Sequence, residues 1–381
     1  MRVLHLVKTS VGGQFAFRQM RRLVKLGVEV HVAVPEGPMV PKYTEAGIQV
    51  HAIQFDFPIS APWRWPAMKG AFLRLVDEIK PDIIHSHFVG TTLTMRLALG
   101  NKVPIPRVFN VPGTLHLESL FFQRAEFATA NKYDYWIGSC KWICDCYRKL
   151  GVSERHIFMT YYGSEIDVFG VQEKGKLRKE LGLAPDIQIV GMVAFIYAPK
   201  YYLGQTQGLK GHEDLIDAIK ICREVNPNIV GVFVGGPWKG ADRYEIVVKE
   251  YAKKHCNDGV IFLGTRQDVA DLYADFDVAV HPSHSESLGG AAESLLHGVP
   301  TIATSVGGLT DIVINDETGW LVPPKCPKEL AIAILESLAD TEKCKRMTQQ
   351  GQKFARRVLD VRENAKQIYA AYQQIIADHA K

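Results

Sequence analysis

The sequence predicts an α/β protein made of two doubly wound domains, each built on a parallel sheet, with a helical C-terminal tail. Three observations support this expectation. Short apolar runs alternate with amphipathic stretches from the N-terminus onward, the alternation restarts after a charged stretch at 173–186, and residues 327–381 show helical periodicity alone. Strands that alternate with helices form right-handed βαβ units, and such units build parallel sheets.

The first domain opens with a strand, a glycine loop, a helix and a second strand. The apolar run RVLHLV predicts a buried strand at 2–7. Phe17, Met20 and Leu23 then lie on one face of a predicted helix that Gly27 ends. Further strands are predicted in VEVHVAV, GIQVHAI, PDIIHSHF, IPRVFNV and YDYWIGS, and a helix in AMKGAFLRLVDEIK.

The second domain repeats this pattern. Its predicted strands are IQIVGMV, NIVGVFVGG, VIFLG, DVAVHPS and PTIATSV, and its predicted helices are HEDLIDAIKICREV, YEIVVKEYAKKH, DVADLYADF and AAESLLHG. We therefore expect one domain at 1–180, a second at 181–360, and a helix at 361–381 that packs back on the first. Ligands bind such sheets at the carboxyl ends of the strands, so the loops there are the expected site.

The composition indicates a globular protein, and from the N-terminal stretch and the short apolar runs we expect neither a secretory signal nor a membrane span. Apolar residues make up 47% and charged residues 23% of the 381 residues. Residues 1–180 hold 24 Lys+Arg against 16 Asp+Glu, a net charge of +8, whereas the remainder carries −4. A basic first domain suits an anionic partner such as a phospholipid surface, and random surface variation is the alternative. The seven cysteines at irregular spacing indicate reduced thiols, so we expect a cytoplasmic protein, with peripheral contact to the inner face of the cell membrane as an extension.

Two glycine loops precede predicted helices, one in each domain. Gly12 and Gly13 follow the first strand, where bare backbone and a helix N-terminus suit an anion, and a tight turn without ligand is the alternative. In HPSHSESLGGAAESLLHGVP, at 281–300, we expect Gly289 and Gly290 to offer backbone N–H groups to a phosphate.

Two glutamates flank the second glycine pair. We expect Glu286 in the loop and Glu293 in the first turn of a helix that starts near Ala291, where both carboxylates could accept hydrogen bonds from sugar hydroxyls. The alternative is that Glu293 complements the helix dipole and Glu286 is a solvated loop residue.

A long basic loop, PKYYLGQTQGLKGHED, follows the first strand of the second domain. Lys200 and Lys210 both precede its helix, and a diphosphate needs cations of this kind. Ordinary surface lysines are the alternative, although long loops in compact domains are often functional.

Histidines also end two strands of the first domain. His116, in NVPGTLHLES, could hydrogen-bond a ligand or act as an acid or base, or it could be a satisfied buried histidine. His85 and His87 with Asp82 suggest no metal site, because no third ligand has suitable spacing.

Taken together, these motifs resemble the retaining glycosyltransferases of family 4, group 1. TSVGGQ resembles the family's N-terminal glycine loop, KPDIIHSHF its PDxxHxH strand, YYGSEIDVF the segment that ends its first domain, and LKGHEDLIDAI its KGxxxLxxA helix start. The stretch at 281–324 is similar to the family's most specific signature, in which PSxxE precedes ExxxxGxP and a later glycine pair. The resemblance implies the GT-B fold, in which two Rossmann-like domains face a cleft, and a nucleotide-sugar donor bound mainly by the second domain.

The resemblance also implies a role for each matching position. Lys210 would neutralise the diphosphate, Glu293 would accept from the ribose hydroxyls, Glu286 would contact the sugar, and His116 would sit near the anomeric carbon. The expected catalytic residues are His116, Glu286 and Lys210, and the expected donor-binding residues are Gly12, Gly13, Lys200, Lys210, Gly289, Gly290 and Glu293. Neither a metal nor a cofactor is expected.

Three positions depart from the family's pattern. Six residues separate Glu286 from Glu293, where the family has seven, so either the loop is shorter by one or Ser285 takes the register of the first glutamate. The family's arginine after the first strand of the second domain is absent, and Lys200 is the candidate replacement. Tyr162 stands where an asparagine is common.

The expected reaction is transfer of a sugar from a nucleoside-diphosphate sugar, UDP- or GDP-linked, to an acceptor hydroxyl in glycan, polysaccharide or glycolipid synthesis. In the family, the anomeric configuration is retained and the leaving phosphate assists deprotonation of the acceptor. The alternatives are a nucleotide-sugar epimerase or hydrolase of the same fold and a catalytically silent sugar-binding protein. Nucleic acid is not an expected partner, and a missing dinucleotide fingerprint disfavours an NAD oxidoreductase.

The acceptor is unknown, and one segment suggests that it is lipid-linked. Trp63, Arg64 and Trp65 are followed by further basic residues, a mixture that suits a membrane interface. An ordinary loop packed by its aromatic side chains is the alternative.

Overall fold

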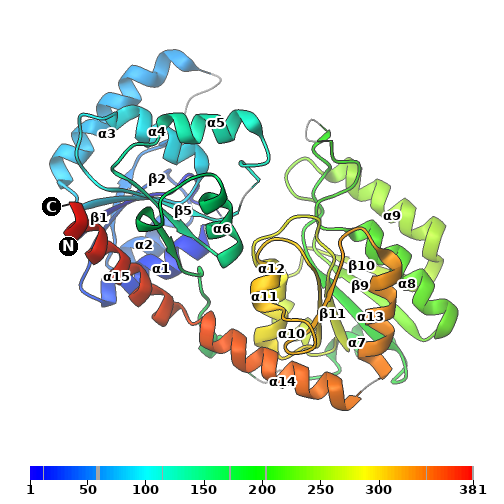
Figure 1. Cartoon of the computed structure of the whole chain (residues 1–381). Coiled ribbons are helices and arrows are strands. Elements are labelled where there is room, and N and C mark those ends of the chain that lie inside the picture. Colours follow the sequence, from blue (N-terminus) through cyan, green and yellow to red (C-terminus); the bar gives the residue numbers. More distant parts are fainter. Residues whose placement is uncertain are drawn as a thin grey trace. The chain divides into compact units, whose positions relative to one another are not determined.

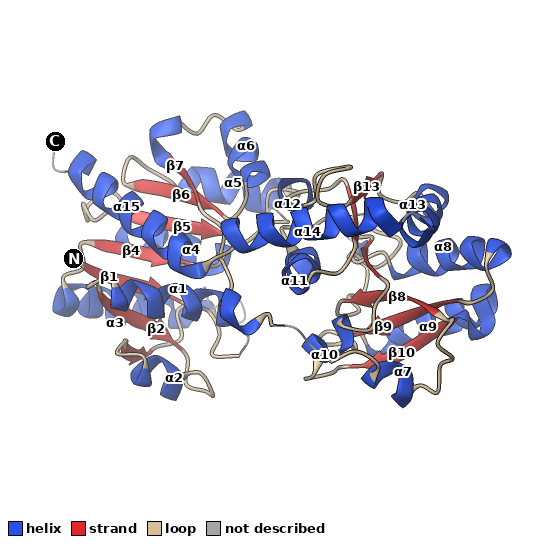
Figure 2. Cartoon of the chain, turned by 90° about the horizontal axis from the view of Figure 1, so that it is seen from below, coloured by secondary structure: helices blue, strands red, loops and turns tan. Residues whose placement is uncertain are grey.

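The computed structural model describes residues 1–11, 13–56, 61–113, 115–170, 173–201, 204–339 and 341–379, and its contacts divide the chain into two compact units. Unit 1 comprises Met1–Glu165 and Val358–Lys381, and unit 2 comprises Ile166–Arg357. Each unit contains one parallel sheet with its own helices (Figure 2).

Unit 1 has a seven-stranded parallel sheet in the order β3-β2-β1-β4-β5-β6-β7. Figure 2 shows the succession from β2 through β1 and β4 to β7. The order reverses at β1, which pairs with both β2 and β4. The elements of this unit, in chain order, are β1 (Arg2–Leu6), α1 (Gln14–Lys25), β2 (Glu29–Val34), α2 (Val40–Glu45), β3 (Gln49–Ala52), α3 (Trp65–Ile79), β4 (Ile83–Ser86), α4 (Val89–Leu99), β5 (Arg107–Val111), α5 (Leu120–Thr129), β6 (Asp134–Gly138), α6 (Lys141–Lys149), β7 (Ile157–Met159) and α15 (Val361–His379).

Successive residues of β1 contribute to opposite faces of this sheet. Val3 belongs to the core beneath α1 and α15, whereas Leu4 belongs to the core beneath α3 and α4. Because side chains alternate along a strand, a sheet covered by helices on both faces needs apolar residues at nearly every position. The run RVLHLV meets this requirement.

The C-terminal helix α15 belongs to unit 1 and packs against α1 (Figure 1). Ile368, Tyr372 and Ile375 share one buried cluster with Phe17 and Met20. Segments from the two ends of the chain therefore complete the same core.

Unit 2 has a six-stranded parallel sheet in the order β10-β9-β8-β11-β12-β13. Its elements are α7 (Lys176–Glu180), β8 (Gln188–Val193), α8 (His212–Val225), β9 (Ile229–Val234), α9 (Asp242–Cys256), β10 (Val260–Gly264), α10 (Val269–Tyr273), β11 (Val278–His281), α11 (Gly289–His297), β12 (Thr301–Thr304), α12 (Leu309–Ile312), β13 (Trp320–Val322), α13 (Pro327–Ala339) and α14 (Thr341–Val358).

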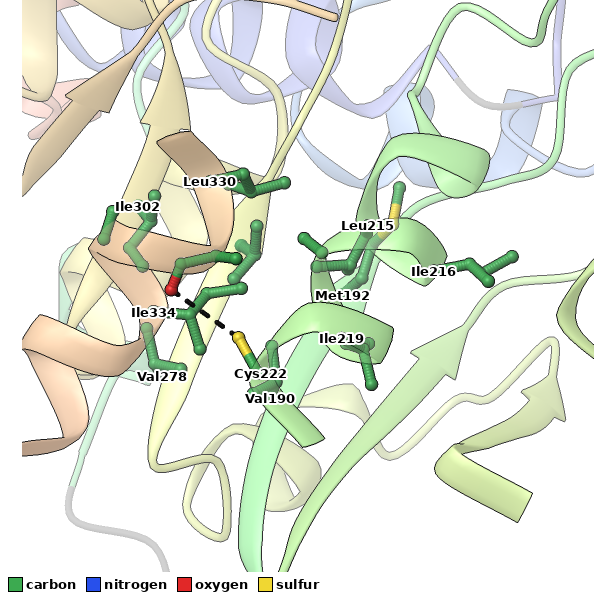
Figure 3. Close-up of a cluster of buried hydrophobic side chains, with 14 of the residues drawn as sticks. Val190, Met192, Leu215, Ile216, Ile219, Cys222, Val278, Ile302, Leu330 and Ile334 are labelled. Carbon is green, nitrogen blue, oxygen red and sulfur yellow. Dashed lines mark hydrogen bonds between the residues drawn. The ribbon is translucent and has the colours of Figure 1, made fainter. Parts of the chain in front are cut away.

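Figure 3 shows how two helices cover one face of this sheet. Ile219 of α8 and Ile334 of α13 are fully buried with Val190 and Val278 of the central strands. The thiol of Cys222 lies 3.5 Å from the Ala331 carbonyl, so α8 and α13 also meet through a polar contact. This core fixes the position of α8 relative to β8 and β11.

The two units divide at Glu165/Ile166, earlier in the chain than the boundary near 180 predicted from the sequence. Asp275 explains why the segment around α7 belongs to unit 2: its carboxylate accepts hydrogen bonds from the backbone N–H groups of Gly175 and Leu177, at 2.5 and 2.7 Å. Leu177 is fully buried in a core cluster of unit 2. The charged composition at 173–186 therefore marks a capped helix of unit 2 and not a linker.

No helix in the described ranges has both the length and the hydropathy that crossing a membrane requires.

Candidate active site

The site in unit 2 lies where β8 and β11 run side by side. Val278 pairs with Val190 and Ala279 with Gly191, so these two strands are neighbours although two βα units separate them in the chain. In doubly wound sheets, ligands bind at the carboxyl ends of the strands where the order reverses. The loops that follow β8 and β11 lie at this reversal.

These two loops pack on each other. The backbone N–H of His284 donates to the Leu209 carbonyl at 2.8 Å, and its ring Nε2 lies 2.6 Å from Asp214 Oδ2 in the first turn of α8. Gly211 has φ +70°, and a Cβ there would overlap the Pro282 carbonyl, so only glycine allows this approach. The packing leaves Lys210 next to the loop that carries Glu286.

Lys210 Nζ and the Glu286 carboxylate form an ion pair, with 18% and 16% of the two side chains exposed. The same ammonium lies 5.8 Å from the centre of the Tyr197 ring. Burial, together with the charge of Lys210, lowers the pKa of both His212 and His281 to about 3, so both imidazoles are neutral. Lys210 and Glu286 are therefore the charged pair around which this part of the site is built.

Helix α11 begins at Gly289, two residues earlier than predicted, against the ends of β8 and β11. Gly289 has φ +48°. At Gly290 a Cβ would lie 2.9 Å from His281 Cε1 and 3.1 Å from the Val193 carbonyl oxygen. Glycine therefore brings the N-terminal amides of α11 directly to the strand ends, a position that favours anions.

A cavity of about 260 Å³ opens beside this helix start. Lys210 contributes the cation from one loop, and Glu293 of α11 contributes an exposed carboxylate. The residues that line the cavity are Val193, Ala194, Phe195, Tyr197, Lys210, Val234, Gly235, Thr265, Arg266, Val269, Gly290 and Glu293. A cation, helix amides and a carboxylate around one concave space suit a ligand that carries both phosphate and hydroxyl groups.

In unit 1, His116 follows β5 and contacts a buried carboxylate. Its Nε2 lies 2.9 Å from Glu126 Oε2 and 3.1 Å from the Tyr147 hydroxyl. The His116 side chain is 9% exposed, and that of Glu126 is fully buried. The imidazole therefore has fixed partners on the Nε2 side.

Three buried histidines lie together at the reversal point of the unit 1 sheet. His5 of β1 joins His85 and His87, and their nearest ligand atoms lie within 4.8 Å of one another. The sequence predicts no third ligand near His85 and His87, and this prediction is wrong. Strand β1 supplies His5, which lies 80 positions before His85 in the chain. Within this trio His5 Nδ1 and His87 Nε2 are 2.9 Å apart, as in a hydrogen bond. The His87 ring stacks on His85 and on His5 at centroid distances of 4.4 and 5.2 Å, and the His5 and His85 rings are tilted by 31°.

This arrangement suits neutral hydrogen-bonded rings better than metal ligands. His87 is stacked nearly parallel on both neighbours, a geometry in which the lone pairs of stacked rings do not converge on one ion, and the proton between His5 and His87 occupies a site that a metal would need. Burial lowers the pKa of all three imidazoles, that of His87 to about 3.

Comparison with known families decides what kind of protein carries these sites. The model of the group 1 glycosyl transferases matches residues 201–354, and that of glycosyltransferase family 4 matches residues 12–167. The chain belongs to glycosyltransferase family 4, group 1.

The curated relatives of this family 4 chain include many bacterial glycosyltransferases. The D-inositol 3-phosphate glycosyltransferase of Mycobacteroides abscessus is 34% identical over 186 residues, which cover 48% of this chain and 39% of the relative. That of Pseudarthrobacter chlorophenolicus is 24% identical over 331 residues, covering 79% and 75%. The chain spans about two fifths of the length of the first curated relatives it matches.

Solved structures confirm the fold predicted for the family. HepE from Anabaena, solved in complex with UDP-glucose, superimposes with a TM-score of 0.81 at 22% identity and covers 97% of this chain and 98% of its own. Sucrose-phosphate synthase from Thermosynechococcus elongatus gives 0.78 at 20% identity, covering 99% and 100%. The prediction of two Rossmann-like sheets of the GT-B class with a helical C-terminal region is therefore correct.

The structure brings together four of the residues that the family resemblance singled out in the second domain. Lys210, Gly290 and Glu293 line one cavity, and Glu286 pairs with Lys210. Glu293 lies one turn further into α11 than predicted, because the helix starts at Gly289.

Three further predicted donor-binding residues are Lys200, Gly12 and Gly13. Lys200 is not among the residues that line the cavity, and its backbone N–H donates to the Gln205 side chain at 2.9 Å. Gly13 caps the start of α1, while Gly12 lies outside the described residues.

Sequence reasoning missed three residues near these sites. Arg266, after β10, lines the cavity and pairs with Glu180 and Asp268. Glu126 and His5 were also missed. A basic residue two positions after a predicted strand was a usable signal for Arg266, whereas nothing local distinguished His5 or Glu126.

Proposed function

We propose that this chain transfers a sugar from a nucleoside-diphosphate sugar to an acceptor hydroxyl. The observation that carries the proposal is the Lys210–Glu286 pair beside the α11 N-terminus, at the rim of a cavity that Glu293 also lines. The ammonium and the helix amides suit the diphosphate, and the carboxylates suit the hydroxyls of ribose and sugar.

For the donor we propose a UDP-linked hexose as the first candidate. HepE, which shares the fold, is solved with UDP and with UDP-glucose.

For the acceptor we propose a small phosphorylated molecule. The relatives above are named D-inositol 3-phosphate glycosyltransferases. The positive net charge of residues 1–180 suits a negatively charged acceptor of this kind.

In the proposed reaction the anomeric configuration is retained and no metal is needed. The bond from the anomeric carbon to the phosphate oxygen breaks while the bond to the acceptor oxygen forms on the same face of the sugar. The acceptor proton passes to the leaving phosphate. Lys210 and the helix amides hold the negative charge that develops on the diphosphate.

The test is a panel of UDP- and GDP-linked sugars, read first as thermal stabilisation and then as product formation with and without acceptor. Binding of one donor and acceptor-dependent product support transfer. Nucleotide release that is independent of acceptor would assign hydrolysis, and no binding across the panel would overturn the proposal. Two further measurements test metal independence and retention of the anomeric configuration. Activity should be unchanged by EDTA, and proton NMR should find an α-linked product from an α-linked donor.

We further propose that unit 1 contacts a membrane or a lipid-linked acceptor through Trp63. Its side chain is 74% exposed, whereas Trp65 packs against a buried cluster at the start of α3. Exposed tryptophan beside Arg64 suits a lipid interface. Sedimentation with vesicles containing anionic lipid tests this: Trp63→Ala should reduce binding, and no binding by the unmodified chain would overturn the idea.

A further inference from the structure

Glu126 is a fully buried carboxylate beside His116. Trp136 Nε1 donates to Glu126 Oε1 at 2.8 Å, and the Tyr147 hydroxyl donates to the same oxygen at 2.9 Å. The other oxygen, Oε2, lies 2.9 Å from His116 Nε2. β6 and α6 therefore supply donors to Oε1, and the loop after β5 places the His116 ring beside Oε2.

This carboxylate is ionised. Burial by itself would raise its pKa, but His116, Arg96 and Trp136 outweigh burial and leave the pKa of Glu126 below its ordinary value. Arg96 adds a neighbouring positive charge, because its guanidinium donates to the Glu126 backbone carbonyl at 3.0 Å. A buried charge of this kind is costly unless hydrogen bonds compensate it, and here two donors reach Oε1.

The hydrogen-bond pattern fixes the tautomer of His116. The single proton of the Tyr147 hydroxyl is donated to Glu126 Oε1, so the contact between that hydroxyl and His116 Nε2 needs its proton from the imidazole. The Nε2–H points toward the Tyr147 oxygen, with Oε2 beside it. A bare Nε2 lone pair would instead face a carboxylate at 2.9 Å, which is repulsive. Nε2 of His116 therefore carries a proton, and in the neutral ring Nδ1 is the unprotonated nitrogen.

We propose that Glu126 is a positioning residue that holds His116 as the Nε2–H tautomer and so makes Nδ1 the hydrogen-bond acceptor for a hydroxyl group of the substrate. The inference rests on the proposed function, since it gives His116 a substrate to contact. A histidine that presents Nδ1 accepts a hydrogen bond from a sugar or acceptor hydroxyl, whereas the other tautomer would donate one.

The chain offers a matched control for the loss of a buried carboxylate. Asp134 is as buried as Glu126, and Arg96 Nε donates to it at 2.8 Å. Asp134→Asn therefore removes a buried charge from the same region with no direct contact to His116. A purely structural role for Glu126 predicts that Glu126→Gln and Asp134→Asn behave alike.

The experiment compares Glu126→Gln, Asp134→Asn and His116→Ala in the full chain. Imidazole ¹⁵N NMR should find the Nε2–H tautomer of His116 in the unmodified chain and in Asp134→Asn. In Glu126→Gln the amide NH₂ meets the ring Nε2, so the tautomer should change to Nδ1–H. The kcat should fall at least tenfold in Glu126→Gln, with the donor KM within about twofold, while Asp134→Asn lowers Tm and leaves kcat within about twofold.

Each outcome has a separate meaning. An unchanged tautomer in Glu126→Gln overturns the inference, as does a kcat loss of equal size in Asp134→Asn. If Glu126→Gln does not fold, Glu126→Asp withdraws the carboxylate from His116 Nε2 by one methylene, and an unchanged tautomer population and kcat there overturn the inference as well. If the unmodified chain uses no donor, the proposed function fails, while the NMR result still decides whether Glu126 sets the tautomer.

Discussion

Lys210 and Glu286 form an ion pair although 76 positions separate them in the chain. The loop after β8 carries the lysine, and the loop after β11 carries the glutamate. The family resemblance implies different parts of a donor for these two charges, the diphosphate for Lys210 and the sugar for Glu286. Because each is the other's partner, a diphosphate that binds Lys210 competes with Glu286 for it.

Replacing Lys210 by alanine should lower the rate of sugar transfer about 10²-fold, because the cation that stabilises the leaving diphosphate is lost. Steady-state kinetics with the donor found in the panel measures the effect. Lys328→Ala, which changes an exposed lysine of α13 in the same unit, is the matched control and should be neutral. Turnover that survives in Lys210→Ala would remove this residue from the mechanism.

Replacing Glu286 by glutamine should have opposite effects on binding and on turnover. UDP alone should bind up to about fivefold more tightly, because Lys210 no longer has a competing carboxylate and such a partly exposed pair is worth about 1 kcal/mol. Transfer should nevertheless slow, because a contact to the sugar is lost. Calorimetric titration with UDP and initial rates provide the two readings. Weaker UDP binding in Glu286→Gln would contradict competition.

Replacing Gly290 by alanine should displace the start of α11. The added Cβ would lie 2.9 Å from His281 Cε1, and overpacking at such a contact costs about 1 to 3 kcal/mol. A lower Tm and a lower donor affinity should appear together. Gly170→Ala is the comparison, because nothing lies within 4 Å of a Cβ at that position. Donor affinity that stays unchanged in Gly290→Ala would show that the helix start does not hold the donor.

Acid should destabilise the chain well above the range in which carboxylates titrate. His87, His212 and His281 have a pKa of about 3 in the folded chain because burial disfavours the imidazolium. The unfolded chain binds protons at these sites below about pH 6.5 and the folded chain does not. Stability is therefore full above that pH and falls as the pH drops toward 3.

Each such histidine contributes a slope of about 1.4 kcal/mol per pH unit at most. Urea unfolding at pH 7.5, 6 and 5 measures the slope. Tryptophan fluorescence and circular dichroism both follow the unfolding, because coincident curves from two probes are needed to show that the two units unfold together. His87→Leu should reduce the slope by the contribution of one histidine, which is about 1.4 kcal/mol per pH unit at most. A free energy of unfolding that is constant from pH 7 to 5 would show that these rings are protonated in the fold.

The elements of both sheets were predictable because their causes are local. The run RVLHLV and its counterpart IQIVGMV became β1 and β8, since strands buried on both faces need continuous apolar sequence. The boundary at 180 failed for a tertiary reason: the carboxylate that caps α7 is Asp275, about 100 residues away. Charged composition alone cannot reveal which unit such a segment joins.

The sequence by itself determined the alternating architecture, the glycine loops at strand ends and the family to which the chain belongs. Only the tertiary structure decided which side chains act together: Lys210 with Glu286, His5 with His87, and His116 with Glu126. The physical reason is the winding order. A parallel sheet whose strand order reverses at its first strand brings together strand ends that are distant in sequence. No periodicity in the sequence predicts that β8 pairs with β11.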